Sequence, residues 1–490
     1  MKNKIVSALL GLCCVAACGT AEKSAPQPIP ITQGTGTCLI DFVDPQDGES
    51  PGFLSDEAAE AEIKELAAKF DLAPAGLYSE TNHLYQKTGA CPLIESNLVE
   101  NIEPSAMYHL PANELTLMEE YDHGLDSSAP TNDPLLEHQW NLHHIDAFDA
   151  WKNSKQGKGV VVAVIDTGVA YKEHEKVHAL EDMNETDFTE GVSFTRRGLP
   201  DGLDDHAHGS HVAGTIAQST NNGIGVAGVA PKATIMALKV LSASGSGTTA
   251  DIANAIRYAA DHGAHVINMS LGGPYPSDIM RDAVDYAHEK GVTVVCAAGN
   301  ENSSRVGYPA GYEHCIAVSS TNKQKGRSWF SNYGKDIYVA APGGDTRNHA
   351  YDGILQNTIN PRNIKEQGYY GFQGTSMASP HAAAVAALII GEGVTDNEEV
   401  WRILKESAVH PKDMERDDDY GFGIINANRA VLMARGQDGD EDGPPLRKYR
   451  WYIIGGVLFL VVVFVGFRGY QALKRVESDH RDFDDDEDLN

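Results

Sequence analysis

Runs of apolar, β-branched residues alternate with helical patterns through residues 134–435. Four such runs are VVVAVID (160–166), TIMALKVL (234–241), HVINMSL (265–271) and VTVVCAAGN (292–300). Between them, ADIANAIRYAADHG and DIMRDAVDYAHEKG repeat apolar residues at helical spacing. Strands that are apolar on both faces and separated by helices indicate a parallel sheet buried between helical layers. This part of the sequence therefore predicts a doubly wound α/β domain.

A smaller pattern precedes this domain, in residues 36–111. CLIDFVD is typical of a strand, and Ser55 can cap a helix with apolar residues at helical spacing. GLYSETNHLYQ then alternates as strands do. We expect a small α+β domain here, followed by a polar, acidic connector over residues 112–133.

The N-terminus has the pattern of an export signal. MKNKIVSALLGLCCVAACGT combines a basic start, an apolar run and a small-residue exit. VAAC at 15–18 resembles a bacterial lipobox with Cys18 as the lipidated residue, and an ordinary signal peptide is the alternative. We expect a lipoprotein-type signal peptide over residues 1–18 and a flexible tether over 19–35.

Residues 451–467 form a second apolar segment of 17 residues without a charge. As a helix it spans about 25 Å, near the lower limit for a bilayer core of about 30 Å. A buried helix of a soluble domain is the alternative, but the acidic linker over 436–450 separates the segment from any core. We expect a transmembrane helix followed by an acidic cytoplasmic tail, residues 468–490. Export of the N-terminus then places the large domain outside the cytoplasmic membrane, in a bacterial cell envelope.

The net charge argues against one class of partner, and the cysteine spacing argues against one kind of metal site. The formal net charge of −30 argues against a nucleic-acid surface, because phosphates are repelled. Of seven cysteines, four lie outside the signal region, and their spacing fits no zinc pattern. In an exported chain they are available to pair as Cys38–Cys91 and Cys296–Cys315, although spacing alone does not fix the pairing.

Four short motifs carry the groups that a serine needs to hydrolyse an amide. AVIDTGV supplies Asp166 at a strand end, DDHAHGSHVAGT supplies His208, VVCAAGNEN supplies Asn300, and GFQGTSMASPH supplies Ser376 among small residues. Each has a structural alternative: Ser376 as a helix N-cap, Asp166 as an ordinary strand end, and the histidine-rich loop as a metal site. Together, in this order and on a parallel sheet, the four motifs favour a catalytic site that has a nucleophile, its base, an orienting acid and an oxyanion donor.

Residues 134–435 resemble subtilisin-family serine peptidases, the thermitase branch in particular. The matching stretches are NDPLLEHQWNLHHIDAFDAW, VVAVIDTGV, HGSHVAGT, VINMSLGG, AAGN and GTSMASPH. The resemblance implies an orienting acid at Asp166, a general base at His208, a nucleophile at Ser376 and an oxyanion donor at Asn300. His211, Ser379 and His381 then have structural roles.

The chain departs from the family pattern at several positions. His206-Ala207 stands where Asn-Gly is usual, Ser210 replaces a threonine, and Ala383 replaces a glycine. None of these changes removes a catalytic group. Residues 344–371 form a longer loop than the smallest members carry, and its role is left open.

The resemblance also implies a substrate cleft with an uncharged main pocket. A glycine floor at Gly307 favours large apolar or aromatic side chains, and Thr249 leaves the next pocket open. The implied substrate-binding residues are Ser270, Leu271, Gly272 and Gly273 as an edge strand, Ala297, Ala298 and Gly299 as a wall, and Gly245, Ser246 and Gly247 on the opposite side.

A structural calcium ion is implied at the turn STNNGIGVAG, residues 219–228. A metal-free Asn-Gly turn is the alternative, since Glu175 stands where the family has an aspartate. The implied ligands are the side chains of Asp133, Glu175 and Asn222 and the carbonyls of Ser219, Ile224 and Val226.

The N-terminal domain resembles the family's inhibitory propeptide, with VENIEP (99–104) as a matching ending. Cleavage within residues 111–133 would leave the lipid on the removed piece and the peptidase on its transmembrane helix. The sequence thus predicts a membrane-anchored serine endopeptidase that acts on proteins or peptides. Its alternatives are a dedicated processing protease similar to mycosins, a catalytically silent peptide-binding protein and, more weakly, a transmembrane sensor.

Overall fold

The computed structural model describes residues 34–44, 55–89, 91–94, 96–110, 115–117, 130–196 and 198–437. The expected signal peptide, transmembrane helix and cytoplasmic tail lie outside these ranges, as do most of the tether, connector and acidic linker. Among the described residues, no helix combines the length and apolar character that crossing a membrane requires.

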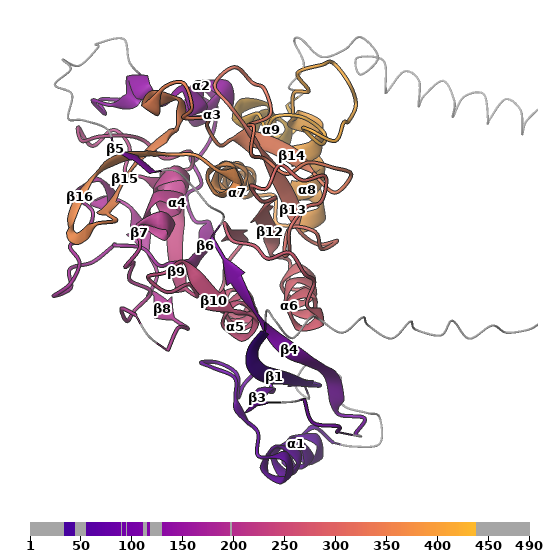
Figure 1. Ribbon diagram of the computed structural model, residues 1–490. Coiled ribbons are helices and arrows are strands. Elements are labelled where there is room, and N and C mark those ends of the chain that lie inside the picture. The colour runs from indigo at the N-terminus through magenta and orange to yellow at the C-terminus, as the bar shows by residue number, and fades with distance from the viewer. Residues whose placement is uncertain are drawn as a thin grey trace, which may run out of the picture.

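The described part of the large domain is built on an eight-stranded sheet in which every pairing is parallel (Figure 1). The strand order is β14-β13-β12-β11-β6-β9-β7, and β8 also pairs with β9. The strands are β6 (Val161–Asp166), β7 (Asp187–Phe188), β8 (Val192–Ser193), β9 (Thr234–Lys239), β11 (Val266–Met269), β12 (Thr293–Ala297), β13 (Ile316–Thr321) and β14 (Val339–Pro342). The predicted doubly wound α/β architecture is confirmed.

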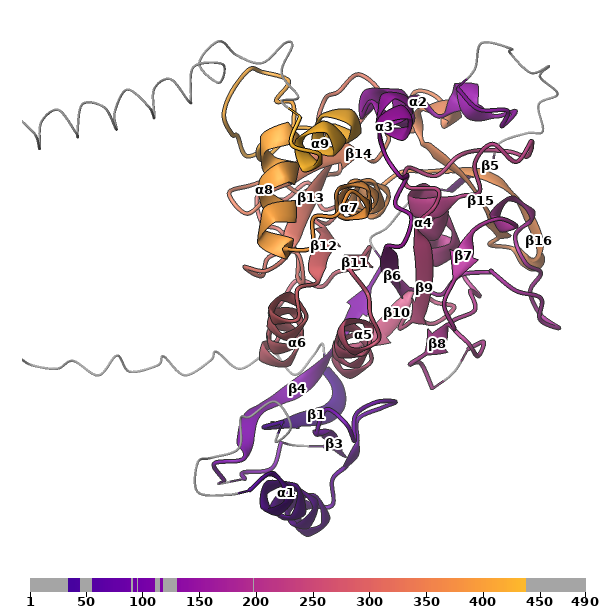
Figure 2. The ribbon, with the colours of Figure 1, turned by 180° about the vertical axis from the view of Figure 1, so that it is seen from behind.

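Helices cover both faces of this sheet (Figure 2). Alternate strand residues enter two separate apolar cores, so that Val162 and Val164 of β6 face one and Ala163 and Ile165 face the other. The first core is closed by α3 (Ala147–Asn153), α4 (His208–Ala217), α7 (Thr375–Gly391), α8 (Asn397–Ser407) and α9 (Ala427–Ala434), and the second by α5 (Thr249–Asp261) and α6 (Asp278–Glu289). The short elements η3 (Leu136–His138), α2 (Trp140–His144), η4 (Glu181–Met183) and η5 (Ala350–Asp352) lie in connecting segments.

Residues 34–110 form a separate N-terminal module with its own core (Figure 1). It consists of β1 (Gly34–Phe42), α1 (Asp56–Phe70), β2 (Ala73–Pro74), β3 (Leu84–Thr88) and β4 (Val99–His109). As the sequence predicts, Ser55 caps α1, since its hydroxyl accepts the backbone N–H of Ala58 at 3.3 Å. The C-terminal end of β4 extends out of the module and pairs with β10 (Ser246–Thr248) of the large domain.

The cysteines differ from the expected pairing at one of two places. Cys38 and Cys91 form a disulfide that closes the N-terminal module. Cys296 and Cys315 are instead buried thiols whose sulfurs lie 3.2 Å apart. Burial raises the pKa of the Cys315 thiol well above its usual range. A raised pKa disfavours the thiolate, which is the form that attacks when a disulfide is made.

The longer loop noted in the sequence is a β-hairpin that packs beside α4. Strands β15 (Ile354–Asn360) and β16 (Asn363–Phe372) form it, and β5 (Leu115–Leu117), from the connector, pairs with β16 as a third strand (Figure 1). The sequence indicates neither this hairpin nor the strand added to it.

Candidate active site

Asp166 and His208 meet at the carboxyl end of the central strand β6. Asp166 is the last residue of β6, His208 is the first residue of α4, and both side chains are buried. Nδ1 of His208 lies 2.7 Å from Oδ1 of Asp166. A carboxylate only accepts hydrogen bonds, so it holds the proton of the imidazole on Nδ1. Nε2 has no hydrogen-bond partner among the described residues, which suits it to accept a proton.

Asp204, which the sequence does not single out, organises the loop that carries His208. Its Oδ1 accepts the Thr167 hydroxyl at 2.9 Å, and its Oδ2 accepts both the backbone N–H and the hydroxyl of Ser210. Gly209 is required because a Cβ there would lie 2.1 Å from the carbonyl oxygen of Gly168. The feature of the sequence that could have indicated Asp204 is an acidic residue four positions before a histidine that begins a helix.

Ser376, the second residue of α7, exchanges hydrogen bonds with Ser270. The Ser376 hydroxyl donates to the Ser270 carbonyl at 3.1 Å, and the Ser270 hydroxyl donates to the Ser376 carbonyl at 2.8 Å. Ser379 donates to Asn268, which in turn donates to Ser270. The structure therefore joins Asp166 directly to His208, whereas the Ser376 hydroxyl is turned toward Ser270.

Asn300 lies just after β12 and is oriented by Thr375, the residue before the serine. Its Oδ1 accepts the backbone N–H of Thr375 at 2.9 Å and the Thr375 hydroxyl at 2.8 Å. The Thr375 hydroxyl also accepts the N–H of Gly299 at 3.1 Å. Since both bonds use the carbonyl half of the amide, the NH₂ half of Asn300 is directed away from Thr375.

The expected substrate-binding segments hold the end of the N-terminal module between them. His109 exchanges two backbone hydrogen bonds of 3.1 Å with Gly272, and Leu110 donates to the Gly245 carbonyl at 2.9 Å. On the other side, β4 pairs with β10 so that Tyr108 lies opposite Gly247 and His109 opposite Ser246. The module's last described residues thus lie as a strand between the two edges that the sequence assigns to substrate.

The walls of this cleft are small and uncharged. Gly307 donates to the Ala298 carbonyl at 3.0 Å, and a Cβ on Gly307 would lie 3.4 Å from the carbonyl of Gly273. Tyr108 is almost fully buried, packs under Gly273 and shares an apolar cluster with Leu271. Ala297 is likewise buried at the end of β12.

Comparison with known proteins agrees with this geometry. The sequence model of the Subtilase family, peptidase S8, matches residues 157–423. The chain belongs to the subtilase family. Subtilisin Savinase of Lederbergia lenta is 38% identical over 293 residues, 60% of this chain and 98% of that relative. Thermitase of Thermoactinomyces vulgaris is 40% identical over 263 residues, 54% of this chain and 86% of the relative.

A solved structure extends the similarity beyond the large domain. Fervidolysin from Fervidobacterium pennivorans, a keratinolytic enzyme related to subtilisin, superposes with a TM-score of 0.64 at 25% identity. The match covers 82% of this chain and 62% of fervidolysin. Together with the relatives above, it shows that this subtilase is a subtilisin-like serine endopeptidase.

Two other histidines of this subtilase are structural in their contacts. His211 is bonded through Nε2 to the carbonyls of Ile354 and Tyr370, and burial lowers its pKa to about 3. His381 donates from Nδ1 to the Met377 carbonyl, and burial lowers its pKa to about 4. Both rings are therefore neutral near pH 7. His206 packs 6.4 Å from the His208 ring, and burial lowers its pKa as well.

The expected calcium turn brings together a different set of carboxylates. Asp133 accepts the backbone N–H groups of Asn221 and Asn222, and Asp182 accepts the Asn222 side-chain amide at 3.0 Å and the Val226 N–H at 2.9 Å. Glu175, in contrast, is exposed, and within the described part of the chain its side chain forms no hydrogen bond to this turn. The sequence does not indicate Asp182, because this residue lies in the short helix η4, outside any motif. Ser219, the first residue of the turn, donates its N–H to the Asp182 carbonyl.

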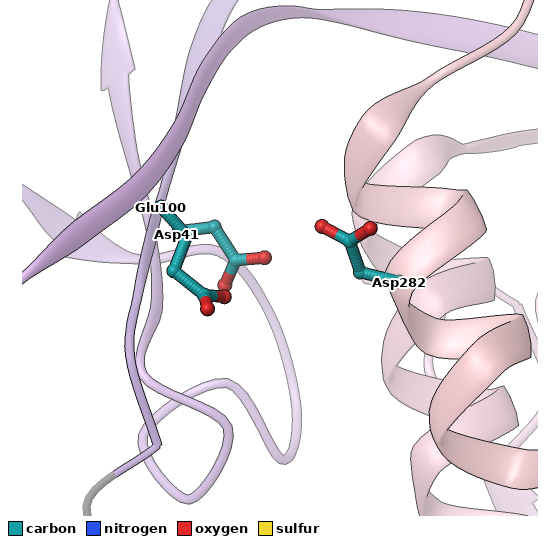
Figure 3. A group of neighbouring side chains, drawn as sticks. All are labelled: Asp41, Glu100 and Asp282. Atoms are coloured by element: carbon teal, nitrogen blue, oxygen red, sulfur yellow. The ribbon is translucent and has the colours of Figure 1, made fainter. Parts of the chain in front are cut away.

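The N-terminal module contacts α6 through acidic side chains (Figure 3). Asp41 and Glu100 of the module face Asp282 of α6 across the contact. Burial raises the pKa of Asp41 well above its usual range, so its carboxyl stays neutral to a higher pH than an exposed aspartate does. Glu103 caps α6, since it accepts the Ser277 hydroxyl and the Asp278 N–H. Strand pairing and helix capping thus hold the module against the large domain.

Proposed function

We propose that this subtilase cleaves peptide bonds through Asp166, His208 and Ser376, and the Asp166–His208 hydrogen bond is the observation that carries the proposal. Ser376 Oγ turns from the Ser270 carbonyl to Nε2 of His208 and attacks the substrate carbonyl as Nε2 takes its proton. The imidazolium is stabilised by the Asp166 carboxylate and then protonates the departing amine. Water repeats the sequence on the acyl-enzyme and releases the second product.

Asn300 supplies the donor for the negative charge that forms on the carbonyl oxygen. Thr375 fixes the amide of Asn300 through its carbonyl half, which pre-orients the NH₂ group before reaction. The start of α7, where Ser376 lies, adds the positive end of a helix dipole. The Asn300 amide and the helix dipole are in place before the reaction, so they stabilise the charge of the transition state without having to reorient.

We also propose that the chain is made as a zymogen whose N-terminal module is an inhibitory propeptide. The support is that Tyr108, His109 and Leu110 lie in the cleft in the hydrogen-bonding pattern expected of substrate. Cleavage within residues 111–133 would then free the cleft. The lipid at Cys18 would stay with the module, and the peptidase would stay on its C-terminal helix outside the bacterial cytoplasmic membrane, where it meets protein and peptide substrates.

Sequencing the N-termini of the membrane-bound chain tests the zymogen proposal. The main species is expected to begin within residues 111–133, because that segment follows directly on the residues seated in the cleft. A main species that still begins at Cys18 would contradict it.

We further propose that calcium binds at the turn over residues 219–228. The donor set fits a hard cation, since buried Asp182 and Asp133 lie beside Asn222 and burial raises the pKa of Asp182 to about 8. The carbonyls of Ile224 and Val226 accept no hydrogen bond among the described residues. Asp133, Asp182, Asn222 and these carbonyls would hold the ion, whose positive charge offsets the repulsion between the carboxylates.

Calcium removal is expected to lower the melting temperature of the wild type by about 10 °C, since saturating ligand contributes about 4 kcal/mol. Glu175→Gln is expected to keep this calcium effect and Asp182→Asn to lose it. Thermal unfolding with and without chelator measures both. Equal calcium effects in the two variants would contradict the ligand set.

A further inference from the structure

The chain forms one strand at the end of the N-terminal module and a second in the connector, and both pair with segments of the candidate active site. At the end of the first strand, His109 and Leu110 bond to Gly272 and Gly245. The second strand, β5, runs antiparallel to β16, with Leu115 opposite Phe372, Thr116 opposite Gly371 and Leu117 opposite Tyr370. Residues 111–114 alone separate the two strands, and β16 ends four residues before Ser376.

We propose that the outer edge of β16 at Tyr370–Phe372, here called the docking edge, binds the part of a polypeptide substrate that follows the scissile bond. The bound segment adds a third strand to the β15–β16 hairpin, as residues 115–117 do in the uncut chain. This deepens the proposed function, on which it rests, by extending substrate contact beyond the residues before the cut. Substrates long enough to reach the docking edge are then favoured over short peptides.

The docking edge is rigidly joined to the helix that carries the catalytic base. Phe372 stacks on His211 of α4 with ring centroids 4.1 Å apart, and His211 bonds to the carbonyls of Tyr370 and Ile354. Thr358 of β15 donates to the carbonyl of Ala207, directly before His208. A strand held this firmly binds a partner without a further ordering cost.

Strand alternation predicts which substrate side chains are selected. Side chains opposite Gly371 and Tyr369 lie on the hairpin face that carries Leu355 and Asn357, because cross-strand neighbours share a face. On that face lies a cavity of about 600 Å³. Its lining includes Leu355, Asn357 and Tyr369. The lining also includes two carboxylates, Glu181 and Glu366, and contains no lysine or arginine.

The cavity has the chemistry to receive a long basic side chain. Asn357 is 2% exposed, and its Oδ1 accepts no hydrogen bond within the described part of the chain. An apolar stem would pack on Leu355 and Tyr369, while the cationic tip donates to Asn357 and approaches Glu181. Lysine or arginine opposite Gly371 is therefore preferred over glutamate.

The test compares peptides of this chain's own sequence on the processed enzyme. When the cut falls within residues 111–114, residues 115–117 stay on the processed enzyme and compete in cis for the docking edge. An enzyme that carries both Leu115→Pro and Thr116→Pro is therefore assayed beside the wild type, because whichever of these two neighbouring residues bonds to β16 then lacks its amide proton. A peptide of residues 104–118 is expected to have a KM about tenfold lower than one of residues 104–114, most clearly with the double-proline enzyme. Hydrolysis of the short peptide reports the proposed function separately.

N-methylation of the long peptide supplies the control for strand pairing. In an antiparallel pair only alternate residues bond to the partner strand. Two methylated peptides are compared: one has N-methyl groups at Leu115 and Leu117, and the other has one at Thr116. The peptide whose methyl groups replace amide protons bonded to β16 is expected to have a KM about tenfold higher. The other peptide is expected to show no change. Replacing Thr116 of the peptide by lysine is expected to raise kcat/KM severalfold over glutamate, a preference that Glu181→Gln enzyme reduces.

Equal KM values for the short and long peptides in both enzymes would overturn the docking edge. Equal increases in KM for the two methylated peptides would also overturn it, since that result points to contacts other than strand pairing. No preference for lysine over glutamate would overturn the assignment of the cavity.

Discussion

Ser376→Ala is expected to abolish self-processing of the full chain, with a rate about 10⁵–10⁶-fold below that of the wild type. The reason is that alanine lacks the hydroxyl oxygen that attacks the scissile carbonyl. The magnitude is taken over from subtilisin, a member of the same family, in which loss of the serine costs about 10⁶-fold. A time course of N-terminal sequencing and gel analysis measures the rate.

Two controls separate lost chemistry from lost folding. Ser379→Ala removes a hydroxyl of the same helix that donates to Asn268, so it is expected to cost about 1–3 kcal/mol of stability while processing continues. Ser376→Ala chain is expected to be cut within residues 111–133 when a trace of processed wild type is added. Processing of Ser376→Ala alone, at a tenth of the wild-type rate or faster, would contradict the nucleophile assignment.

Asp166→Asn is expected to lower the processing rate about 10⁴-fold, the loss seen when the same change is made in an unrelated serine peptidase. Asp166 Oδ1 accepts both the His208 Nδ1 proton and the Thr167 N–H, each at 2.7 Å. An asparagine can instead present its NH₂ group to Nδ1, which moves the imidazole proton to Nε2. In that tautomer His208 cannot accept the proton of Ser376.

Asp251→Asn is the matched control for this change. Asp251 is a partly buried carboxylate near the cleft that bonds to Thr248 rather than to an imidazole. Its variant is expected to process within about threefold of the wild-type rate, as followed by the same time course. A rate for Asp166→Asn within tenfold of wild type would show that this carboxylate does not set the tautomer.

The main sheet could be predicted from sequence because its strands carry their own pattern. Residues 160–166 and 292–300 are apolar on both faces, and the structure uses those faces for two cores. The hairpin of β15 and β16 could not, because its inward face holds Gln356 and Thr358, whose polar groups bond to the backbone of the large domain. Polar residues satisfied in this way hide the alternation that indicates a strand.

The residues of the candidate active site could be predicted because each stands in a local motif, whereas their tertiary partners could not. Asp182 approaches Asn222 only after folding, from a position 40 residues earlier, so the sequence favoured Glu175 instead. Cys296 and Cys315 differ from expectation in the opposite way, because folding brings their sulfurs close together but no bond joins them. Spacing fixes neither which carboxylate reaches a turn nor whether two thiols react.

The proposed catalysis depends most on a reactive alcohol at Ser376 beside the imidazole of His208. Treating the processed chain with a fluorophosphonate and mapping the modified peptide by mass spectrometry tests this directly. One label, on Ser376, is expected in the wild type and none in His208→Ala. A label on another serine, or equal labelling of Ser376 in both proteins, would contradict it.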